Sequence, residues 1–529
     1  MLRTKHLVKA LPAMMLLSFS NASMAQSPVI EINGGKVEGV SEGSIEVFKG
    51  IPYAKPPVDE LRWRAPQPVD SWANTIEAKN FIDDCAQQAF PNDVAPSTAP
   101  FSENCLGVNV WKPQGSTDEK LPVMVWIHGG GHVNGGGSPL VYDLSAFAQQ
   151  GIVAVSFNYR LGRFGFFAHP ALTAEQKGEV LGNYGLLDQI AALEWVKKNI
   201  ASFSGDPENV TVVGESAGGI SIHSLMTSPL VDDLFQKAII QSGSGRVSKS
   251  SRLLSGANAY GQPSAESVGV TFAKKHGIQN DDPNVLSKLR ALSTDEVVDG
   301  LNMFNEYNPT YVSGAFIDGK LVEKDPQEYY KAEKKLNIPL LVGYNEMEIG
   351  FTPQVESFDQ ALQPLKLEPS EKEKALAIFK KFGANTPQEV AQTIGSDTLM
   401  VEPARFVMRS AAAQGADVYG YRFAYVADAD KKIWPAAFHS TEIPFAFNTL
   451  EKKFGENLTV VDKGLAKLMN QYWVNFIKTG SPNGDDLPKW EPYKANEENL
   501  LLFSREGVKD VKMIVEPWSE RLDLITASW

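Results

Sequence analysis

Short runs of apolar, often β-branched residues alternate with longer segments of helical periodicity over most of this 529-residue chain. Several of the short runs are apolar throughout, which is typical of strands covered by helices on both faces. The pattern therefore predicts an α/β fold with a large, mostly parallel central sheet and helices on both of its faces. Strands are expected at residues 123–127, 152–157, 210–213, 238–241, 339–342 and 418–423, and helices at 186–200 and 463–477.

The first 25 residues do not belong to this pattern. Arg3, Lys5 and Lys9 precede an apolar run at 10–17, and small residues surround the position after Ala25. These are the three regions of a secretory signal, so we expect cleavage after Ala25 and a secreted or periplasmic protein. The apolar run is much shorter than the ~20 residues that span a bilayer, and no later segment approaches that length. We therefore expect no stable membrane insertion.

The charge and composition of the chain exclude several classes of protein and of binding partner. The chain has 63 acidic and 50 basic residues, a formal net charge of −13, which disfavours a broad nucleic-acid surface. Hydrophobic residues make up 43% of the sequence, so a wholly disordered or fibrous chain is excluded. No change of composition divides the chain after the leader, and residues 26–529 are expected to form a single domain.

The only two cysteines, Cys85 and Cys105, are natural disulfide partners in an exported protein, because an oxidising compartment lets such a bond persist. They lack further cysteine or histidine ligands at short spacing, which disfavours a structural zinc site. The stretch between them is polar and rich in proline, so we interpret it as an excursion from the sheet.

A serine stands at the junction between a predicted strand and a predicted helix. The strand at 209–213 runs directly into Gly214-Glu215-Ser216-Ala217-Gly218-Gly219, and a helix-compatible run follows as far as Met226. A tight turn of small residues in this position lifts the serine oxygen above the end of the strand. Without the strand and helix Ser216 would be interpreted as a helix cap, but in this context the motif predicts a nucleophile.

A second glycine-rich turn, His128-Gly129-Gly130-Gly131-His132, follows the strand at 123–127. Glycines after a strand let backbone amides face a tetrahedral oxyanion at hydrogen-bond distance. The alternative is an ordinary glycine-rich hairpin tip. Phosphate binding is disfavoured, since the lysine and hydroxyl residue of a Walker loop are absent.

A general base can be sought among only seven histidines. In α/β-hydrolases the chain order is serine, acid, histidine, which leaves only histidines after Ser216. His223 lies on the helix that follows the turn, and His276 is placed at the end of another predicted helix, so His439 is the candidate. The histidines excluded by chain order are His6, His128, His132 and His169.

The acid should follow a strand between Ser216 and His439. The apolar run at 339–343 is the clearest strand there, and Glu346 and Glu348 come directly after it. On the pattern alone the two carboxylates are nearly equal candidates.

Taken together, these motifs make the sequence resemble the type-B carboxylesterase family, which includes cholinesterases, bacterial para-nitrobenzyl esterases and fungal lipases. The pattern is closest to the bacterial para-nitrobenzyl type, and the resemblance extends from about Gly34 to about Tyr493. The matching stretches are residues 48–54, 102–106, 158–162 and 185–189, together with the oxyanion glycines and the turn that has glutamate before serine.

The resemblance implies an α/β-hydrolase fold, a nucleophile at Ser216, an acid at Glu348 and a base at His439. It also implies oxyanion donors at the amides of Gly130, Gly131 and Ala217, supporting roles for Glu215 and Ser242, a Cys85–Cys105 disulfide and an Arg62–Glu103 ion pair. No metal or organic cofactor is implied. The family usually has glycine directly after the acid, where this chain has Ile349.

The expected activity is hydrolysis of small to medium soluble esters through an acyl-enzyme. An interfacial lipase is one alternative, since the segment between the two cysteines forms the lid of lipase relatives. A non-catalytic binding or adhesion protein on the same fold is another, although such relatives have lost the nucleophile. A cholinesterase is disfavoured because residues 86–104 contain no tryptophan to stack on choline. The sequence leaves the oligomeric state open.

Overall fold

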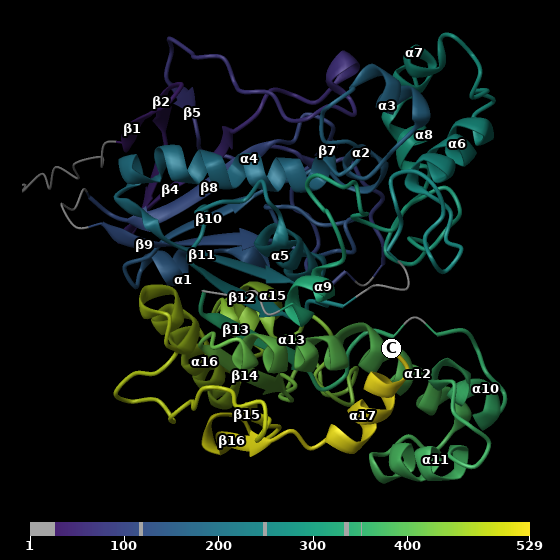
Figure 1. Cartoon of the computed structure of the whole chain (residues 1–529). Coiled ribbons are helices and arrows are strands. Elements are labelled where there is room, and N and C mark those ends of the chain that lie inside the picture. Colours follow the sequence, from purple (N-terminus) through teal and green to yellow (C-terminus); the bar gives the residue numbers. More distant parts are fainter. Residues whose placement is uncertain (1–26, 92, 116–119, 247–250, 333–337, 351) are drawn as a thin grey trace, which may run out of the picture.

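A mixed sheet of 11 strands passes through the molecule (Figure 1). The computed structural model describes residues 27–91, 93–115, 120–246, 251–332, 338–350 and 352–529, so the expected secretory signal lies outside the described residues. From one edge to the other, the strands are β16 (Val511–Val515), β15 (Asn499–Phe503), β14 (Val418–Phe423), β13 (Leu340–Asn345), β12 (Lys237–Gln241), β11 (Gly205–Glu215), β9 (Leu121–Ile127), β10 (Val153–Phe157), β8 (Gly107–Pro113), β4 (Ile45–Pro52) and β3 (Val40–Glu42).

The centre of this sheet is parallel. Every neighbouring pair from β10 across to β15 is parallel, whereas β16 at one edge and β8, β4 and β3 at the other pair antiparallel. All six predicted strands lie in the parallel part. Because parallel neighbours end at the same edge, the segments that follow β9, β11, β12 and β13 emerge side by side.

Alternate side chains of the strands enter two separate cores, one on each face. On β9, Val123, Val125 and Ile127 pack into one core and Met124 and Trp126 into the other. This is the two-residue period of a strand that is buried on both sides. The first core is covered by α4 (Tyr184–Asn199), α5 (Ala217–Thr227) and α13 (Glu402–Ala413), and the second by α1 (Ser145–Ala148), α14 (Ile443–Ala446) and α16 (Val460–Thr479). The predicted fold class is confirmed.

Capping residues explain why α16 is longer than the apolar pattern predicts. Thr459 accepts a hydrogen bond from the backbone of Asp462, whose carboxylate reaches back to Thr459, so the helix begins at Val460 rather than near 463. Its last residue is Thr479, and Gly480, with a φ of 81°, forms the left-handed C-cap. In the described part of the chain no helix is both long and apolar enough to cross a membrane.

Two peripheral groups of helices have small cores of their own, and Figure 1 shows them at the right of the molecule, above and below. The upper group contains α2 (Gly162–Gly165), α3 (Pro170–Glu175), α6 (Ala265–Lys275), α7 (Val285–Arg290) and α8 (Thr294–Val298). The lower group contains α10 (Phe358–Leu362), α11 (Lys372–Lys381), α12 (Pro387–Ser396) and α17 (Ser519–Ala527).

The remaining elements are short. Two small sheets are formed by β1 (Val29–Ile32), β2 (Gly35–Glu38) and β5 (Ile76–Glu77), and by β6 (Asp84–Cys85) and β7 (Phe101–Ser102). The other α-helices are α9 (Pro326–Lys331) and α15 (Leu450–Phe454).

The segment between the two cysteines is fastened to the body at its base. Cys85 and Cys105 form a disulfide, as predicted, and both are buried. Beside it, Arg62 donates to Glu103 through two parallel hydrogen bonds of 2.8 Å and 2.6 Å. Such a bidentate pair, with both side chains almost fully buried, fixes orientation as well as distance. The expected ion pair is therefore present.

We expect the double substitution Cys85→Ala, Cys105→Ala to lower the free energy of unfolding by about 3 kcal/mol, because the unfolded chain regains the entropy of the open loop. Urea unfolding followed by circular dichroism measures the difference. A reductant should destabilise the wild-type protein by a similar amount and leave the variant unchanged. Equal unfolding midpoints for the two proteins would contradict the expectation.

Candidate active site

Ser216 occupies a sharp turn between β11 and α5. Its φ of 52° and ψ of −122° lie in a region that residues other than glycine rarely adopt, so the turn stores backbone strain. The Ser216 amide donates to the carbonyl of Gln241 at 2.9 Å, which ties the turn to the end of β12. The side chain is nearly buried, with 4% of its surface exposed. The structure thus has the predicted order of strand, tight turn and helix.

Close approach of three backbones explains the glycines around Ser216. A Cβ on Gly218 would overlap the carbonyl oxygen of Ile127 at the end of β9. A Cβ on Gly214 would lie 2.6 Å from the carbonyl carbon of Gly218. On the other side, a Cβ on Gly219 would lie 2.9 Å from the Cα of Gly243, just after β12. The turn therefore fits between β9 and β12 only when these positions carry no side chain.

The glycine-rich turn after β9 lies against the same serine. A Cβ on Gly129 would lie 3.0 Å from the Cβ of Ser216 and 2.6 Å from Oε2 of Glu215. Gly130 and Gly131 have φ of 103° and 61°, which favours glycine, and both are partly exposed. The turn therefore packs directly against Ser216 and is not a remote hairpin tip.

His439 reaches this place from the loop between β14 and α14. Its Nδ1 forms a hydrogen bond with Oε2 of Glu348. The other oxygen of Glu348 accepts from the Ser242 hydroxyl at 2.5 Å and from the Asn345 amide at 2.7 Å. Both carboxylate oxygens are thus held, and the imidazole is held through them.

Of the two glutamates that the sequence leaves nearly equal, only one contacts the histidine. Glu346 instead accepts from Arg422 at 2.9 Å and from Arg505 at 2.8 Å. Its charge is therefore compensated near the surface, two residues away from Glu348.

The second nitrogen of the imidazole faces Glu215. Nε2 of His439 lies 3.1 Å from Oε1 of Glu215, without hydrogen-bond geometry, and the Ser440 hydroxyl donates to the same carboxylate oxygen. Among the described residues no hydrogen bond joins Nε2 to the Ser216 hydroxyl. The structure therefore brings Glu215, Glu348 and His439 together beside the Ser216 turn and leaves Nε2 without a hydrogen bond.

Burial and charge act in opposite directions on the imidazole. Burial disfavours its charged form, but the carboxyl groups of Glu215 and Glu348 outweigh burial and raise the pKa of His439 to about 9. Burial also raises the pKa of Glu215, and the histidine opposes that rise. A third carboxyl, Glu442, accepts from Gln241 at 2.9 Å and from Asn345 at 2.6 Å.

Ser440 and Glu442 also belong to this cluster, although no motif in the sequence indicates them. Their only signal in the sequence is that they follow His439 by one and three residues.

Glu306 and Met303, which no motif in the sequence indicates, cover the glycine-rich turn. A Cβ on Gly131 would overlap Oε2 of Glu306 and would lie 2.5 Å from Sδ of Met303. Burial raises the pKa of Glu306 to about 8, although a hydrogen bond with Tyr307 opposes the rise. His132 packs beneath the turn, with Nε2 3.0 Å from the Ser221 hydroxyl.

Comparisons with known proteins give the class. The sequence matches the carboxylesterase family over residues 26–517. It is 34% identical over 496 residues to the para-nitrobenzyl esterase of Bacillus subtilis (strain 168), covering 90% of this chain and 95% of that protein. It is 33% identical over 485 residues to the fumonisin B1 esterase of Sphingopyxis macrogoltabida, covering 89% of this chain and 86% of that protein.

Solved structures agree with the sequence match. A structure of PNB esterase superposes with a TM-score of 0.79 at 30% identity, covering 94% of this chain and 99% of that one. The chain belongs to the carboxylesterase family and has the α/β-hydrolase fold. It is a carboxylic ester hydrolase, and its substrates are small-molecule esters.

We expect Gly218→Ala to destabilise the protein by about 1–3 kcal/mol, because the added methyl group overlaps the carbonyl oxygen of Ile127. A matched control is Gly464→Ala on α16, where the nearest atom would be at 3.5 Å, an ordinary contact. There the change should stabilise by about 0.5–1 kcal/mol, since alanine favours a helix. Thermal unfolding of both variants tests the pair, and equal shifts of the same sign would contradict the packing argument.

Proposed function

We propose that this chain hydrolyses small to medium esters through an acyl-enzyme on Ser216, with His439 as general base and Glu348 as its acidic partner. The observation that carries the proposal is the imidazole itself. Its Nδ1 is bonded to a fixed carboxylate, and its Nε2, which makes no hydrogen bond, lies 3.1 Å from the carboxylate of Glu215, the residue before Ser216. This is the arrangement that activates a hydroxyl for nucleophilic attack.

In the first half of the reaction the Ser216 oxygen attacks the ester carbonyl while Nε2 of His439 takes its proton. The amides of Gly130, Gly131 and Ala217 donate to the oxyanion of the tetrahedral intermediate. When the intermediate collapses, the imidazolium returns the proton to the departing alcohol. Glu348 holds the tautomer and stabilises the imidazolium without taking the proton.

In the second half, water attacks the acyl-enzyme with His439 again as the base. The acid product leaves, and the serine hydroxyl is restored. In each half of the reaction the imidazole takes one proton from the attacking oxygen and returns it to the leaving oxygen. Atoms and charge therefore balance without a cofactor. Ser242 acts as a positioning residue, because its hydroxyl donates to the oxygen of Glu348 that does not face the histidine.

Glu215 acts on the imidazole rather than on the ester. Its carboxylate approaches Nε2 at 3.1 Å and is held by Ser440, so it stabilises positive charge on His439. For proton transfer Nε2 must turn from this carboxylate to the serine hydroxyl. Apo geometries of catalytic hydrogen bonds are often loose and tighten when substrate binds.

We also propose that residues 1–25 direct export and that the protein acts outside the cytoplasm. Two observations support export: the charge and apolar pattern of the leader, and a buried disulfide, which persists in oxidising compartments.

Replacing the nucleophile tests the mechanism directly. We expect Ser216→Ala to lower kcat for p-nitrophenyl butyrate by at least about 10⁴-fold with an unchanged thermal midpoint. Labelling by a fluorophosphonate should disappear in the same variant. Ser224→Ala on the same helix is the matched control and should keep both activity and labelling. Persistent turnover by purified Ser216→Ala would refute the assignment.

The carboxyl group of Glu215 should set the acid limb of the pH profile. Only the neutral imidazole accepts the serine proton, and Glu215 is one of the groups that raise the pKa of His439. Glu215→Gln should therefore move the acid limb of kcat/KM by about 1–3 units toward lower pH. Glu346→Gln removes a carboxylate that pairs with arginines, and it should leave the limb in place. If the acid limb of kcat/KM lies at the same pH in Glu215→Gln as in the wild-type protein, this role of Glu215 is ruled out.

A further inference from the structure

The oxyanion donors of the proposed reaction come from two separate turns. Gly130 and Gly131 lie in the turn after β9, whereas Ala217 begins α5 after β11. Amides that bind one oxygen atom must keep their geometry to within about 0.5 Å, so the two turns have to be held together. The contact between Gly218 and Ile127 joins the bases of the two turns, but the donor glycines lie three and four residues beyond Ile127.

The residue that follows these glycines has a strained backbone. Gly130, Gly131 and His132 have φ of 103°, 61° and 59°, so all three lie in the left-handed region that favours glycine. Two of them are glycines, but the third carries a large side chain. Strain of this kind persists only where the surroundings fix the residue, and it gathers at functional sites. His132 therefore needs contacts that hold it in place.

Two other segments of the chain hold the backbone and the ring of His132. Its carbonyl accepts a hydrogen bond from the Gly162 amide at 2.7 Å and from the Tyr311 hydroxyl at 3.4 Å. The centroid of its ring lies 4.9 Å from that of Phe166, and only 5% of the residue is exposed. The imidazole is therefore a fixed part of the interior and not a mobile surface group.

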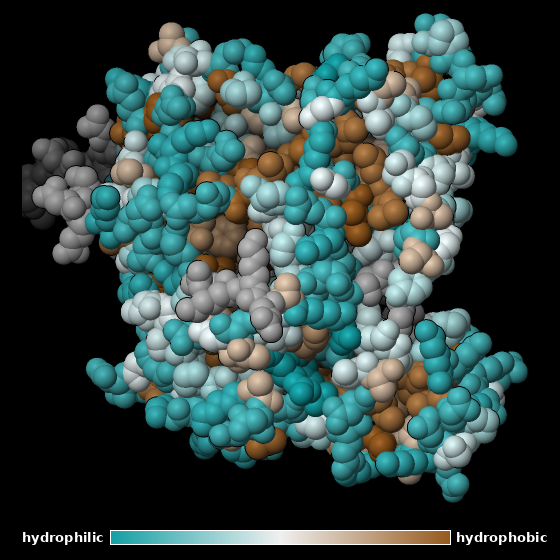
Figure 2. All heavy atoms as spheres, viewed as in Figure 1, coloured by the Kyte–Doolittle hydropathy of each residue, from teal (hydrophilic) through white to brown (hydrophobic). Residues whose placement is uncertain are grey.

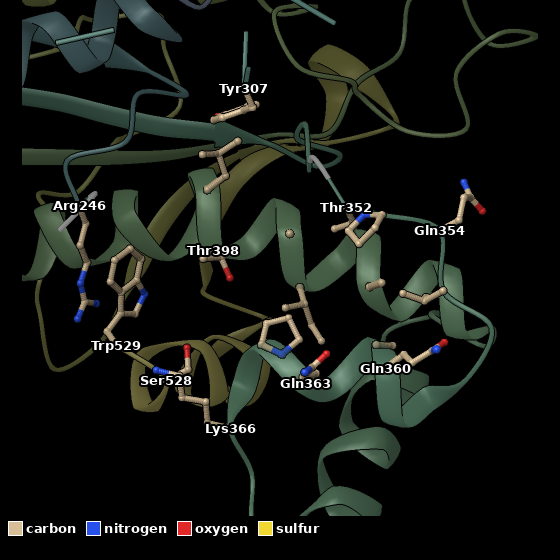
Figure 3. Close-up of a pocket in the computed structure, with 18 of the residues that line it drawn as sticks. Arg246, Tyr307, Thr352, Gln354, Gln360, Gln363, Lys366, Thr398, Ser528 and Trp529 are labelled. Atoms are coloured by element: carbon tan, nitrogen blue, oxygen red, sulfur yellow. The ribbon is translucent and has the colours of Figure 1, made fainter. Parts of the chain in front are cut away.

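His132 is also separate from the open cleft nearby. Figure 2 shows apolar side chains at the lower right of the molecule, over the lower helix group, which forms one wall of a cleft of ≈ 860 Å³. Figure 3 shows Tyr307 on the opposite side of this cleft, four residues before the tyrosine that reaches the carbonyl of His132. Neither His132 nor Ser221 lines the cleft, so a substitution at either leaves its lining as it is.

The side chain of His132 reaches the second turn. Its Nε2 forms a hydrogen bond of 3.0 Å with the hydroxyl of Ser221, which lies one helical turn along α5 from Ala217. Both groups are buried. The same hydroxyl accepts from the side-chain amide of Gln189 at 3.0 Å, so α4 fixes the anchor from its other side. One imidazole thus connects the residue after Gly131 to the first turn of the helix that begins at Ala217.

The imidazole of His132 is neutral. Burial, and to a lesser extent the neighbouring His128, lower the pKa of His132 to about 4, although a hydrogen bond with the Ala217 backbone opposes this. Near neutral pH the ring therefore carries no charge, and it acts on the turns through its hydrogen bonds.

We propose that His132 is a positioning residue: its imidazole ties the turn of Gly130 and Gly131 to the start of α5 and so fixes the spacing of the oxyanion donors. The inference rests on the proposed function, because those amides are the donors of the proposed reaction. The connection matters most when the oxygen carries its negative charge, since preorganised donors are worth most against developing charge.

His132→Phe tests this, because phenylalanine keeps an aromatic ring beside Phe166 and has no hydrogen-bonding atom. The measurements are kcat/KM for p-nitrophenyl butyrate and the Ki of an alkyl trifluoromethyl ketone. The Ser216 oxygen adds to the carbonyl carbon of this ketone and His439 takes the proton, which leaves an oxyanion like that of the intermediate. We expect kcat/KM to fall by about 10- to 100-fold and the Ki to rise by the same factor. Most of the loss should appear in kcat, because the bound ester carries no full charge on that oxygen.

Two variants separate positioning from packing. His132→Gln can place a hydrogen-bonding side-chain amide near the position of Nε2, and it should restore most of the lost kcat/KM. His169→Phe removes another buried imidazole, which accepts from the Ala171 amide at 3.2 Å and caps α3. This control should lower the thermal midpoint but leave kcat/KM and the Ki of the ketone at their wild-type values.

A second pair of variants keeps the test independent of how His132→Phe folds. Ser221→Ala removes the anchor on α5, and it should lower kcat/KM and the affinity for the ketone by a common factor of about 3 to 10, which is the worth of one hydrogen bond. Ser224→Ala makes the same change three residues further along α5 and should leave both unchanged. Fluorophosphonate labelling of Ser221→Ala should still reach completion, because Ser216 and His439 are intact.

Three results would overturn the inference. The first is a folded His132→Phe with wild-type kcat/KM. The second is a fall in kcat/KM without a matching rise in the Ki of the ketone, since the imidazole would then not act on the oxyanion. The third is equal loss in His132→Gln and His132→Phe, since hydrogen bonding would then not be what matters. Failure of the wild-type protein to hydrolyse any ester or to be labelled would instead reject the proposed function.

Discussion

The structure depends on the contact between the backbone of the Ser216 turn and the carboxyl ends of β9 and β12. Gly218 lies against the carbonyl of Ile127, and Gly219 lies against Gly243, with no room for a Cβ at either place. β11 pairs in parallel with β9 on one side and with β12 on the other, so the carboxyl ends of the three strands lie side by side. The strained backbone of Ser216 persists because the surrounding packing holds it in place. The glycine-rich turn after β9 and the segment after β12 then lie next to the serine as a consequence.

A second constraint is the concentration of buried charge around one imidazole. Three carboxyl groups, Glu215, Glu348 and Glu442, surround His439, and each is held by hydroxyl, amide or backbone donors. Carboxylates this close repel one another and stay buried only if some are protonated or paired with a cation. An imidazolium relieves that repulsion, so the cluster favours the charged form of His439, which is the form that the proposed acyl transfer generates. The same preference opposes the neutral form in the resting protein, which makes the site sensitive to pH.

The sequence predicts the parts of this site that follow directly from strand ends. Ser216 and Gly129–Gly131 come immediately after buried strands, and the fold class follows from the apolar runs themselves. The strand pattern does not decide between Glu346 and Glu348, because both come after the same strand, and only the family resemblance favours Glu348. The choice is decided by Arg422 and the loop of His439, which are 76 and 91 residues away. Glu306 and Met303 were missed for the same reason, since only tertiary packing brings their loop onto Gly131.

The candidate active site and the lower helix group rest on different cores. The residues around Ser216 are fixed by the two cores of the central sheet, whereas α10, α11, α12 and α17 pack around a small core of their own. Substitutions in that small core can therefore change the lower helix group while the contact between Gly218 and Ile127 stays intact. On such a fold a change of substrate need not disturb the strained turn.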